Sequence, residues 1–139
     1  MFKCIVVALD GSEQSLLALK YARGIAECFD AKLILVHAYP RTSDLRDLKE
    51  YDDLVGRRKM AGQKIMEVAR EQLDEFAAKV EEDLLEGPAA DAILSAAEIR
   101  KADLIVLGTR GMGSLKGLVF GSVSTKVSQY APCTVMVVR

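Results

Sequence analysis

Cys4-Ile5-Val6-Val7-Ala8-Leu9-Asp10-Gly11-Ser12 is the stretch that decides the fold. Its first six residues are continuously apolar and rich in β-branched side chains, which is typical of a strand covered on both faces. Ser12 can then cap a helix that has Glu13 in its first turn. Apolar residues follow at helical spacing, at Ala18, Ala22, Ile25, Ala26 and Phe29. The stretch therefore predicts a buried strand that leads directly into a helix.

The same alternation continues along the chain. The further predicted strands are Lys32 to Ala38, Val80 to Glu86, Leu104 to Leu107 and Thr134 to Val138. The further predicted helices lie within 45–78, after Gly87-Pro88 and from Ser122 to Tyr130. The long one carries an apolar stripe of Ala61, Ile65, Val68, Ala69, Leu73 and Phe76. The acids of the strand at 80–86 suit a sheet edge. Strands that alternate with helices predict an α/β fold, a doubly wound parallel sheet with helices on both faces.

Length and composition limit the classes of protein. A chain of 139 residues predicts one domain, residues 1–139. The formal net charge of -1 gives no electrostatic reason to expect a nucleic-acid partner. No apolar run reaches the roughly 20 residues that cross a bilayer, so we expect no membrane partner and a cytoplasmic location. Cys4, Cys28 and Cys133 are odd in number and far apart in sequence, which predicts reduced, packed thiols.

The residues that follow the fourth strand are rich in glycine, from Gly108 to Ser122. In an open parallel sheet, ligands bind outside the carboxyl ends of strands, so this loop and Asp10-Gly11-Ser12 can meet if their strands are neighbours. Glycines let a phosphate approach the backbone closely, and the helix that opens at Ser122 points free N–H groups at an anion. Arg110 and Lys116 can add positive charge. A surface loop with turn glycines is the alternative interpretation.

Two better-known phosphate loops are excluded. A Walker loop needs Gly-Lys followed by Ser or Thr, and this tripeptide is absent from the sequence. The dinucleotide fingerprint fails because Gly111 and Gly113 have the first spacing, but the third glycine is displaced to Gly117.

As a set, the motifs are similar to those of the universal stress protein family, and the likeness covers essentially the whole chain. The loop reads Gly108-x-x-Gly111, nine residues, then Gly121-Ser122. The other shared motifs are Val-Ala-Leu-Asp-Gly-Ser at 7–12, Gly87-Pro88 before a helix, and Ala131-Pro132-Cys133 before the last strand. Thr134 stands where many relatives have proline, and Tyr130 where many have histidine or another polar residue. Neither departure changes the nucleotide loop.

The resemblance implies a five-stranded sheet in the order 3-2-1-4-5 that binds ATP, or AMP or ADP, with Mg²⁺ accompanying the nucleotide. It implies adenine contacts near Asp10 and Val36, and phosphate contacts to Gly108, Gly111, Gly121, Ser122 and Val123. The full set of candidate nucleotide-binding residues is Ala8, Asp10, Val36, Gly108, Arg110, Gly111, Gly113, Gly121, Ser122, Val123 and Ser124. Asp10 is also the candidate Mg²⁺ ligand, together with the phosphates.

Two single residues allow more than one interpretation. The Asp10 carboxylate can bond a ribose or help to hold Mg²⁺, or it can only stabilise the turn before the first helix. The resemblance favours the nucleotide contact. His37, the only histidine, is predicted to be a simple strand residue with no catalytic role.

Three functions compete. In the leading hypothesis, ATP occupancy switches a regulatory protein between conformations in a stress response, a context that the resemblance supplies. A slow ATPase or phosphoryl-transfer enzyme is the alternative; it needs a base, metal carboxylates and an arginine, which Asp10 and Arg110 meet only in part. A phosphoacceptor receiver domain normally has several acids at strand one and a lysine at strand five. Here Asp10 stands alone, and 134–138 contains no lysine.

The last strand predicts a homodimer. In the order 3-2-1-4-5, Thr134 to Val138 lies at a sheet edge, and it carries no charge, proline or other device that blunts an edge. Antiparallel pairing with the same strand of a second copy would satisfy its backbone, as the resemblance also implies. The alternative is a monomer whose edge is covered by the chain's own segment in the 40s and 50s.

Overall fold

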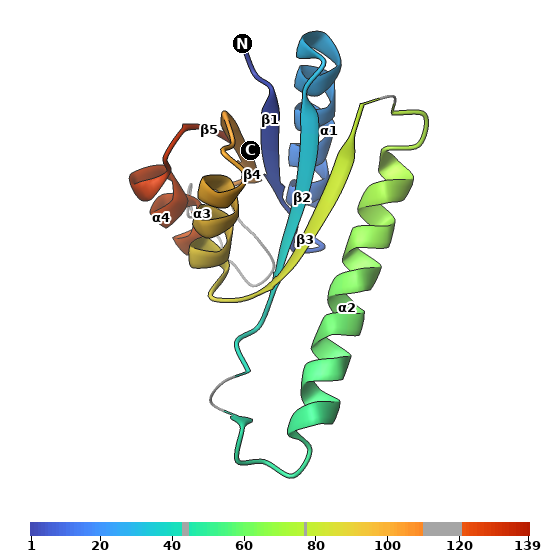
Figure 1. The fold of residues 1–139 in the computed structure, drawn as a ribbon, viewed down its shortest axis with the longest axis vertical. Helices are drawn as coiled ribbons and strands as arrows, with labels where there is room; N and C mark the ends of the chain where they lie inside the picture. Colours follow the sequence, from blue (N-terminus) through green and yellow to red (C-terminus); the bar gives the residue numbers. More distant parts are fainter. Residues whose placement is uncertain (43–44, 77, 110–120) are drawn as a thin grey trace.

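The structure is a computed structural model and describes residues 1–42, 45–76, 78–109 and 121–139 (Figure 1). Its elements are β1 (Cys4–Ala8), α1 (Glu13–Phe29), β2 (Lys32–Tyr39), α2 (Tyr51–Gln72), β3 (Val80–Glu86), α3 (Ala89–Ile99), β4 (Leu104–Gly108), α4 (Ser122–Tyr130) and β5 (Thr134–Val138). The strands form one sheet in the order β3-β2-β1-β4-β5, and every pairing is parallel. The predicted fold class and strand order are confirmed. No helix in the described ranges is long and apolar enough to cross a membrane.

Helices cover both faces of the sheet (Figure 1). α1 and α2 pack on one face, and α3 and α4 on the other. Residues of β1, β2 and β4 alternate between the two resulting cores: Ile5, Val7, Leu33, Leu35, Leu104 and Val106 enter the first, and Val6, Ile34, Val36, Ile105 and Leu107 the second. Burial on both faces explains why these strands are continuously apolar in sequence.

The acidic edge strand β3 is neutralised by basic side chains from neighbouring elements. On the α3 side, Arg100 contacts Asp83 through two nitrogens and lies 3.5 Å from Glu81 Oε1. On the α2 side, Arg70 Nε donates to Glu82 Oε1 at 2.5 Å. Paired acids on an edge keep it hydrated and deter another strand from adding to it.

The long helix buries part of the predicted stripe: Ala69 and Leu73 are core residues, Ile65 and Phe76 pack against the core, and Ala61 and Val68 are exposed. Gly62, Met66, Ala69 and Leu73 are buried, whereas Val68 is 43% exposed. Val68 precedes Ala69 by one position and therefore lies about 100° away from it around the helix. The prediction that Val68 faces the core is wrong.

Candidate functional site

The two strand ends that the sequence singled out lie side by side. β1 and β4 pair at the centre of the sheet, from Ile5↔Leu104 to Val7↔Val106. A Cβ added to Gly108 would lie 3.0 Å from the Cβ of Gln14, in the first turn of α1. Gly108 therefore has a task that sequence analysis did not assign: it lets the start of α1 approach the end of β4.

The turn after β1 is held by its own side chains. Asp10 Oδ1 accepts a hydrogen bond from the Ser12 amide at 2.9 Å, and Ser12 Oγ caps α1 by accepting from the Ser15 amide at 3.1 Å. Gly11 has a φ of 86°, in the left-handed region that favours glycine. The turn-stabilising role of Asp10 is therefore present. Its contacts with a nucleotide and with Mg²⁺ stay predictions.

Helix α4 begins at the end of β4, and Ser124 ties the two elements together. Ser124 is 2% exposed; its hydroxyl donates to the Thr109 carbonyl at 2.8 Å and accepts from the Gly121 amide at 3.1 Å. The Gly121 amide also lies 2.5 Å from the Thr109 carbonyl oxygen. The hydroxyl of Ser124, a candidate nucleotide-binding residue, thus makes its hydrogen bonds inside the protein, where it fixes the start of the helix.

The first amides of α4 belong to Ser122, Val123 and Ser124. Helix geometry leaves these three N–H groups without an intrahelical acceptor, since the first such bond runs from the Thr125 amide to the Gly121 carbonyl at 3.1 Å. The side chain of Ser122 is exposed, while Val123 packs against the core on the α3 side. A helix start of this kind carries partial positive charge and suits an anion.

Ala8 and Val36 are register partners at the carboxyl end of the β1–β2 pair, and both face the α3 side. The side chain of Val36 is 1% exposed and its carbonyl accepts the Leu9 amide at 2.8 Å, so Val36 is a core residue at the base of the site. Ala8 is partly exposed. The remaining predicted residues, Arg110, Gly111 and Gly113, lie outside the described residues.

Thr109 and Gln14 were not singled out from the sequence, yet both hold the site together. Thr109 is 3% exposed; its amide donates to the Val138 carbonyl at 2.8 Å, and its hydroxyl donates to Gln14 Oε1 at 3.4 Å. Thr109 therefore links β4 to β5 and to α1. The available signal was its position directly after a buried strand. Nothing in the sequence distinguishes Gln14 from a solvent-facing residue of a first helical turn.

The predicted metal ligand and the three cysteines all lie among the described residues. Within those residues, no group of three or more His, Cys, Asp or Glu side chains could hold a metal ion. Burial raises the pKa of the Cys4 and Cys133 thiols, as expected of packed cysteines. Cys28 is exposed, so the prediction that it is packed is wrong. It lies about 200° around α1 from the buried Ala26.

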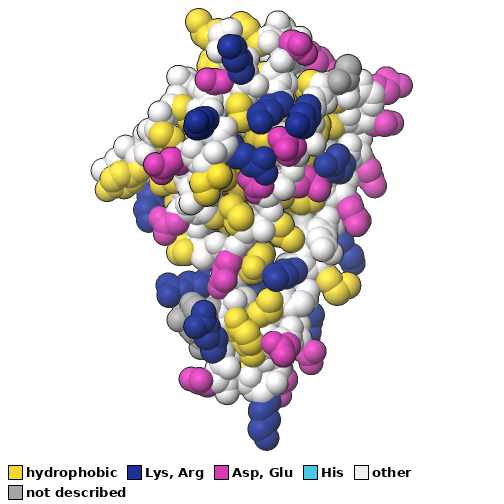
Figure 2. Space-filling model, in the orientation of Figure 1, with side chains coloured by type: hydrophobic (Ala, Val, Ile, Leu, Met, Phe, Trp, Pro, Cys, Tyr) yellow, Lys and Arg dark blue, Asp and Glu magenta, His cyan; other side chains and the backbone are white. Residues whose placement is uncertain are grey.

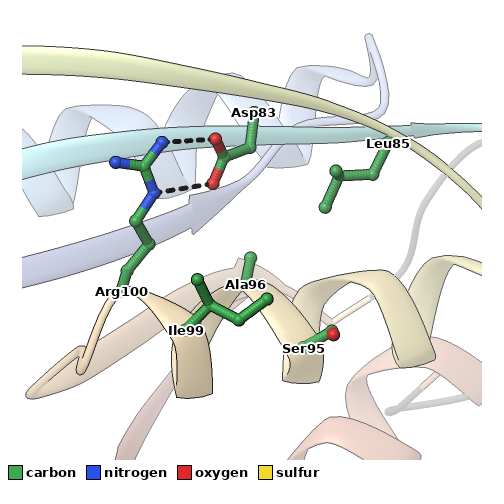
Figure 3. A pocket seen from close by; sticks show the side chains of 6 residues that line it. All are labelled: Asp83, Leu85, Ser95, Ala96, Ile99 and Arg100. Atoms are coloured by element: carbon green, nitrogen blue, oxygen red, sulfur yellow. Dashed lines mark hydrogen bonds and ion pairs between the residues drawn. The ribbon is translucent and has the colours of Figure 1, made fainter.

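A separate pocket lies between β3 and α3 (Figure 3). It measures about 390 Å³ and is lined by Asp83, Leu85, Ser95, Ala96, Ile99 and Arg100. The guanidinium of Arg100 faces the carboxylate of Asp83, so the two charged groups at one end of the pocket satisfy each other (Figure 3). This hollow is away from the ends of β1 and β4, and nothing in it points to a ligand.

Comparisons with known proteins identify the family and support the fold. The model of the universal stress protein family matches residues 1–139. The universal stress protein in the QAH/OAS sulfhydrylase 3' region of Thermus aquaticus is 40% identical over 141 residues, with all of both chains covered. A solved universal stress protein in complex with cAMP is 32% identical, with a TM-score of 0.77 over 99% of this chain and 97% of that one. UspA from Lactobacillus plantarum has a TM-score of 0.87 at 24% identity, over 99% and 98% of the chains.

Proposed function

The chain belongs to the universal stress protein family, and from this premise we propose that it is an adenine-nucleotide-binding regulatory domain that spans residues 1–139. ATP, or its close relatives AMP and ADP, would bind beyond the carboxyl ends of β1 and β4. Occupancy would then switch the protein between two conformations in a stress response, because a ligand favours the state that it binds more tightly.

The start of α4 is the observation that carries the proposal. Its Ser122 and Val123 amides have no acceptor within the helix, and the Ser124 hydroxyl holds the helix start at the end of β4; the Asp10 turn lies at the end of the neighbouring strand. This arrangement fits the two ends of a nucleotide. The amides at the start of α4 would bind the phosphates, and the Asp10 carboxylate would bind the ribose. The relative that binds cAMP supports an adenine nucleotide as the ligand.

The donor set around this site accommodates Mg²⁺ only in a secondary role. Asp10 is the carboxylate that would contact the ion, and its Oδ1 already accepts the Ser12 amide. Nucleotide phosphates would supply the other oxygen ligands that Mg²⁺ prefers. The ion's part would be to neutralise phosphate charge, and Asp10 would orient it from the β1 side.

Charge and cysteine state support a cytoplasmic protein with no nucleic-acid partner. Basic and acidic side chains are interspersed over the face seen in Figure 2, which matches the formal net charge of -1. The described residues on the face shown carry no block of one sign of charge that would attract a polyanion. All three cysteines are free, as is usual where the compartment keeps thiols reduced.

We also propose a homodimer formed through β5. The Thr109 amide donates to the Val138 carbonyl, so the backbone groups of Val138 face β4 and those of Val137, by alternation, face the open edge. The described part of the 40s segment lies elsewhere: Arg58 of α2 donates to the Pro40 and Arg41 carbonyls. This described part of the segment therefore lies away from β5, which favours a second copy of the chain as the partner.

A melting experiment tests the nucleotide site. ATP with Mg²⁺ at about a hundredfold above its dissociation constant should stabilise the chain by roughly 2.7 kcal/mol. Gly121→Val should abolish the shift, because a bulky side chain at the helix start blocks the phosphates. Gly24→Ala, where an added Cβ has open space in α1, should keep it. An unshifted melt of the unmodified chain with ATP, ADP, AMP and cAMP would refute the proposal.

A further inference from the structure

His37 is buried at the carboxyl end of β2, and its ring is bonded to the backbone of another strand. The side chain is 8% exposed, and its Nδ1 lies 2.7 Å from the carbonyl oxygen of Leu9. A carbonyl only accepts, so Nδ1 must carry the proton of this hydrogen bond. The neutral ring therefore has its hydrogen on Nδ1 and its lone pair on Nε2.

The carbonyl that His37 holds stands where β1 leaves the sheet. The β1–β2 register ends at Ala8↔Val36, and Leu9 is the next residue. The Leu9 amide donates to the Val36 carbonyl at 2.8 Å, while the ring of His37 binds the Leu9 carbonyl. Both polar backbone groups of Leu9 are thus fixed by β2. The residue after this clamp is Asp10.

Helix α2 supports the other side of the ring. α2 lies along β2 and β3 (Figure 1), and a Cβ added to Gly62 would lie 2.8 Å from His37 Cδ2 and 3.4 Å from its Nε2. Gly24 and Gly56, by contrast, have nothing within 4 Å of an added Cβ. Of these helical glycines, Gly62 is the one whose missing side chain makes room for the imidazole. The ring is confined between the end of the sheet and α2.

We propose that His37 is a positioning residue for the nucleotide site. Its Nδ1–H fixes the Leu9 carbonyl and so sets the direction in which Asp10-Gly11-Ser12 leaves β1. The ring lies on the α2 side of the sheet and does not itself touch the nucleotide, which would lie toward α4. This inference rests on the proposed nucleotide function and adds α2 to the elements that shape the site.

Two substitutions separate positioning from simple packing. His37→Leu removes the donor but keeps an apolar side chain of moderate size, and His37→Asn keeps an N–H near the position of Nδ1. In calorimetric titration with Mg·ATP, His37→Leu should bind about tenfold more weakly than the unmodified chain. His37→Asn should bind within about threefold of the unmodified chain. Equal affinity of His37→Leu and the unmodified chain would overturn the proposal. So would His37→Asn binding as weakly as His37→Leu.

A second measurement uses the unmodified chain without nucleotide. ¹⁵N-histidine NMR should detect a slowly exchanging proton on Nδ1; a ring protonated only on Nε2 would overturn the proposal whether or not the variants fold. Amide exchange at Ser12 should be faster in His37→Leu and normal in His37→Asn. If the unmodified chain binds no nucleotide, the proposed function fails, and these free-protein measurements still decide whether His37 positions the Asp10 turn.

Discussion

Gly62→Ala isolates the contact between α2 and the end of β2. The new methyl group would lie 2.6 Å from Leu84 Cδ1 and 2.8 Å from His37 Cδ2, both closer than carbon atoms tolerate. Leu84 is partly exposed and can move. The imidazole cannot move freely, because its Nδ1 is bonded to the Leu9 carbonyl at 2.7 Å. The contact with the His37 ring therefore determines how much the substitution lowers the free energy of unfolding.

The magnitude follows from two opposing effects. Replacing a helical glycine with alanine favours the helix by roughly 0.5–1 kcal/mol. Overpacking a buried contact costs about 1–3 kcal/mol. Gly56→Ala, in the same helix with open space around the new methyl group, experiences only the first effect. The helix preference is common to both variants and therefore cancels when their free energies of unfolding are compared. The remaining difference should be about 1–3 kcal/mol, with Gly62→Ala the less stable.

Urea denaturation followed by far-UV circular dichroism measures this difference. Both variants should unfold with the same dependence on urea, so that their midpoints report the free energy of unfolding. Gly24→Ala in α1 is a second reference, because its added Cβ also meets nothing within 4 Å. If Gly62→Ala proves as stable as Gly56→Ala, the ring gives way at no cost, and the reasoning that it is confined is refuted.

Two further predictions concern charge and the edge of the sheet. The amides of Lys3 and Cys4 donate to Asp103 at 2.8 and 2.9 Å and hold its pKa below the usual 3.8. The stabilisation is complete at pH values above the pKa of Asp103 in the unfolded chain. It is lost as the pH falls through the lower pKa of Asp103 in the folded chain. Asp103→Asn should therefore lower the free energy of unfolding by about 1 kcal/mol near neutral pH, and this difference from the unmodified chain should shrink in acid. A difference that does not change with pH in urea titrations would contradict this prediction. Val137→Pro should remove an outward donor and yield monomer, whereas Val137→Ala should stay dimeric; light scattering that finds the unmodified chain monomeric would exclude the dimer.

Much of the fold is predictable because the central strands are buried on both faces. β1, β2 and β4 are apolar runs that can be read without knowing their neighbours. β3 is harder, because its acids are paired with cations such as Arg70 and Arg100. These partners come from other elements, and a local pattern cannot reveal them.

The candidate site was less predictable because side-chain direction is set by tertiary contacts. Spacing placed Ser124 in the first turn of a helix, but could not show that its hydroxyl turns inward to Thr109. Strand periodicity predicts His37 only as a simple strand residue, although a lone polar ring at a strand end, next to a polar turn, is a signal for a structural role. The phosphate contact of Gly108 stays a prediction, and its close approach to Gln14 is a second reason for a glycine that spacing could not reveal.

The two edges of the sheet limit how many copies can join. In the proposed dimer, β5 is the edge of the described sheet that pairs, while β3 at the opposite edge carries paired charges. If two copies join through β5, each has used that edge, and the combined sheet presents an acidic strand at both ends. Growth into a filament would need a second adhesive edge on every subunit. If the proposed dimer forms, this asymmetry of the two sheet edges would therefore stop assembly at two copies.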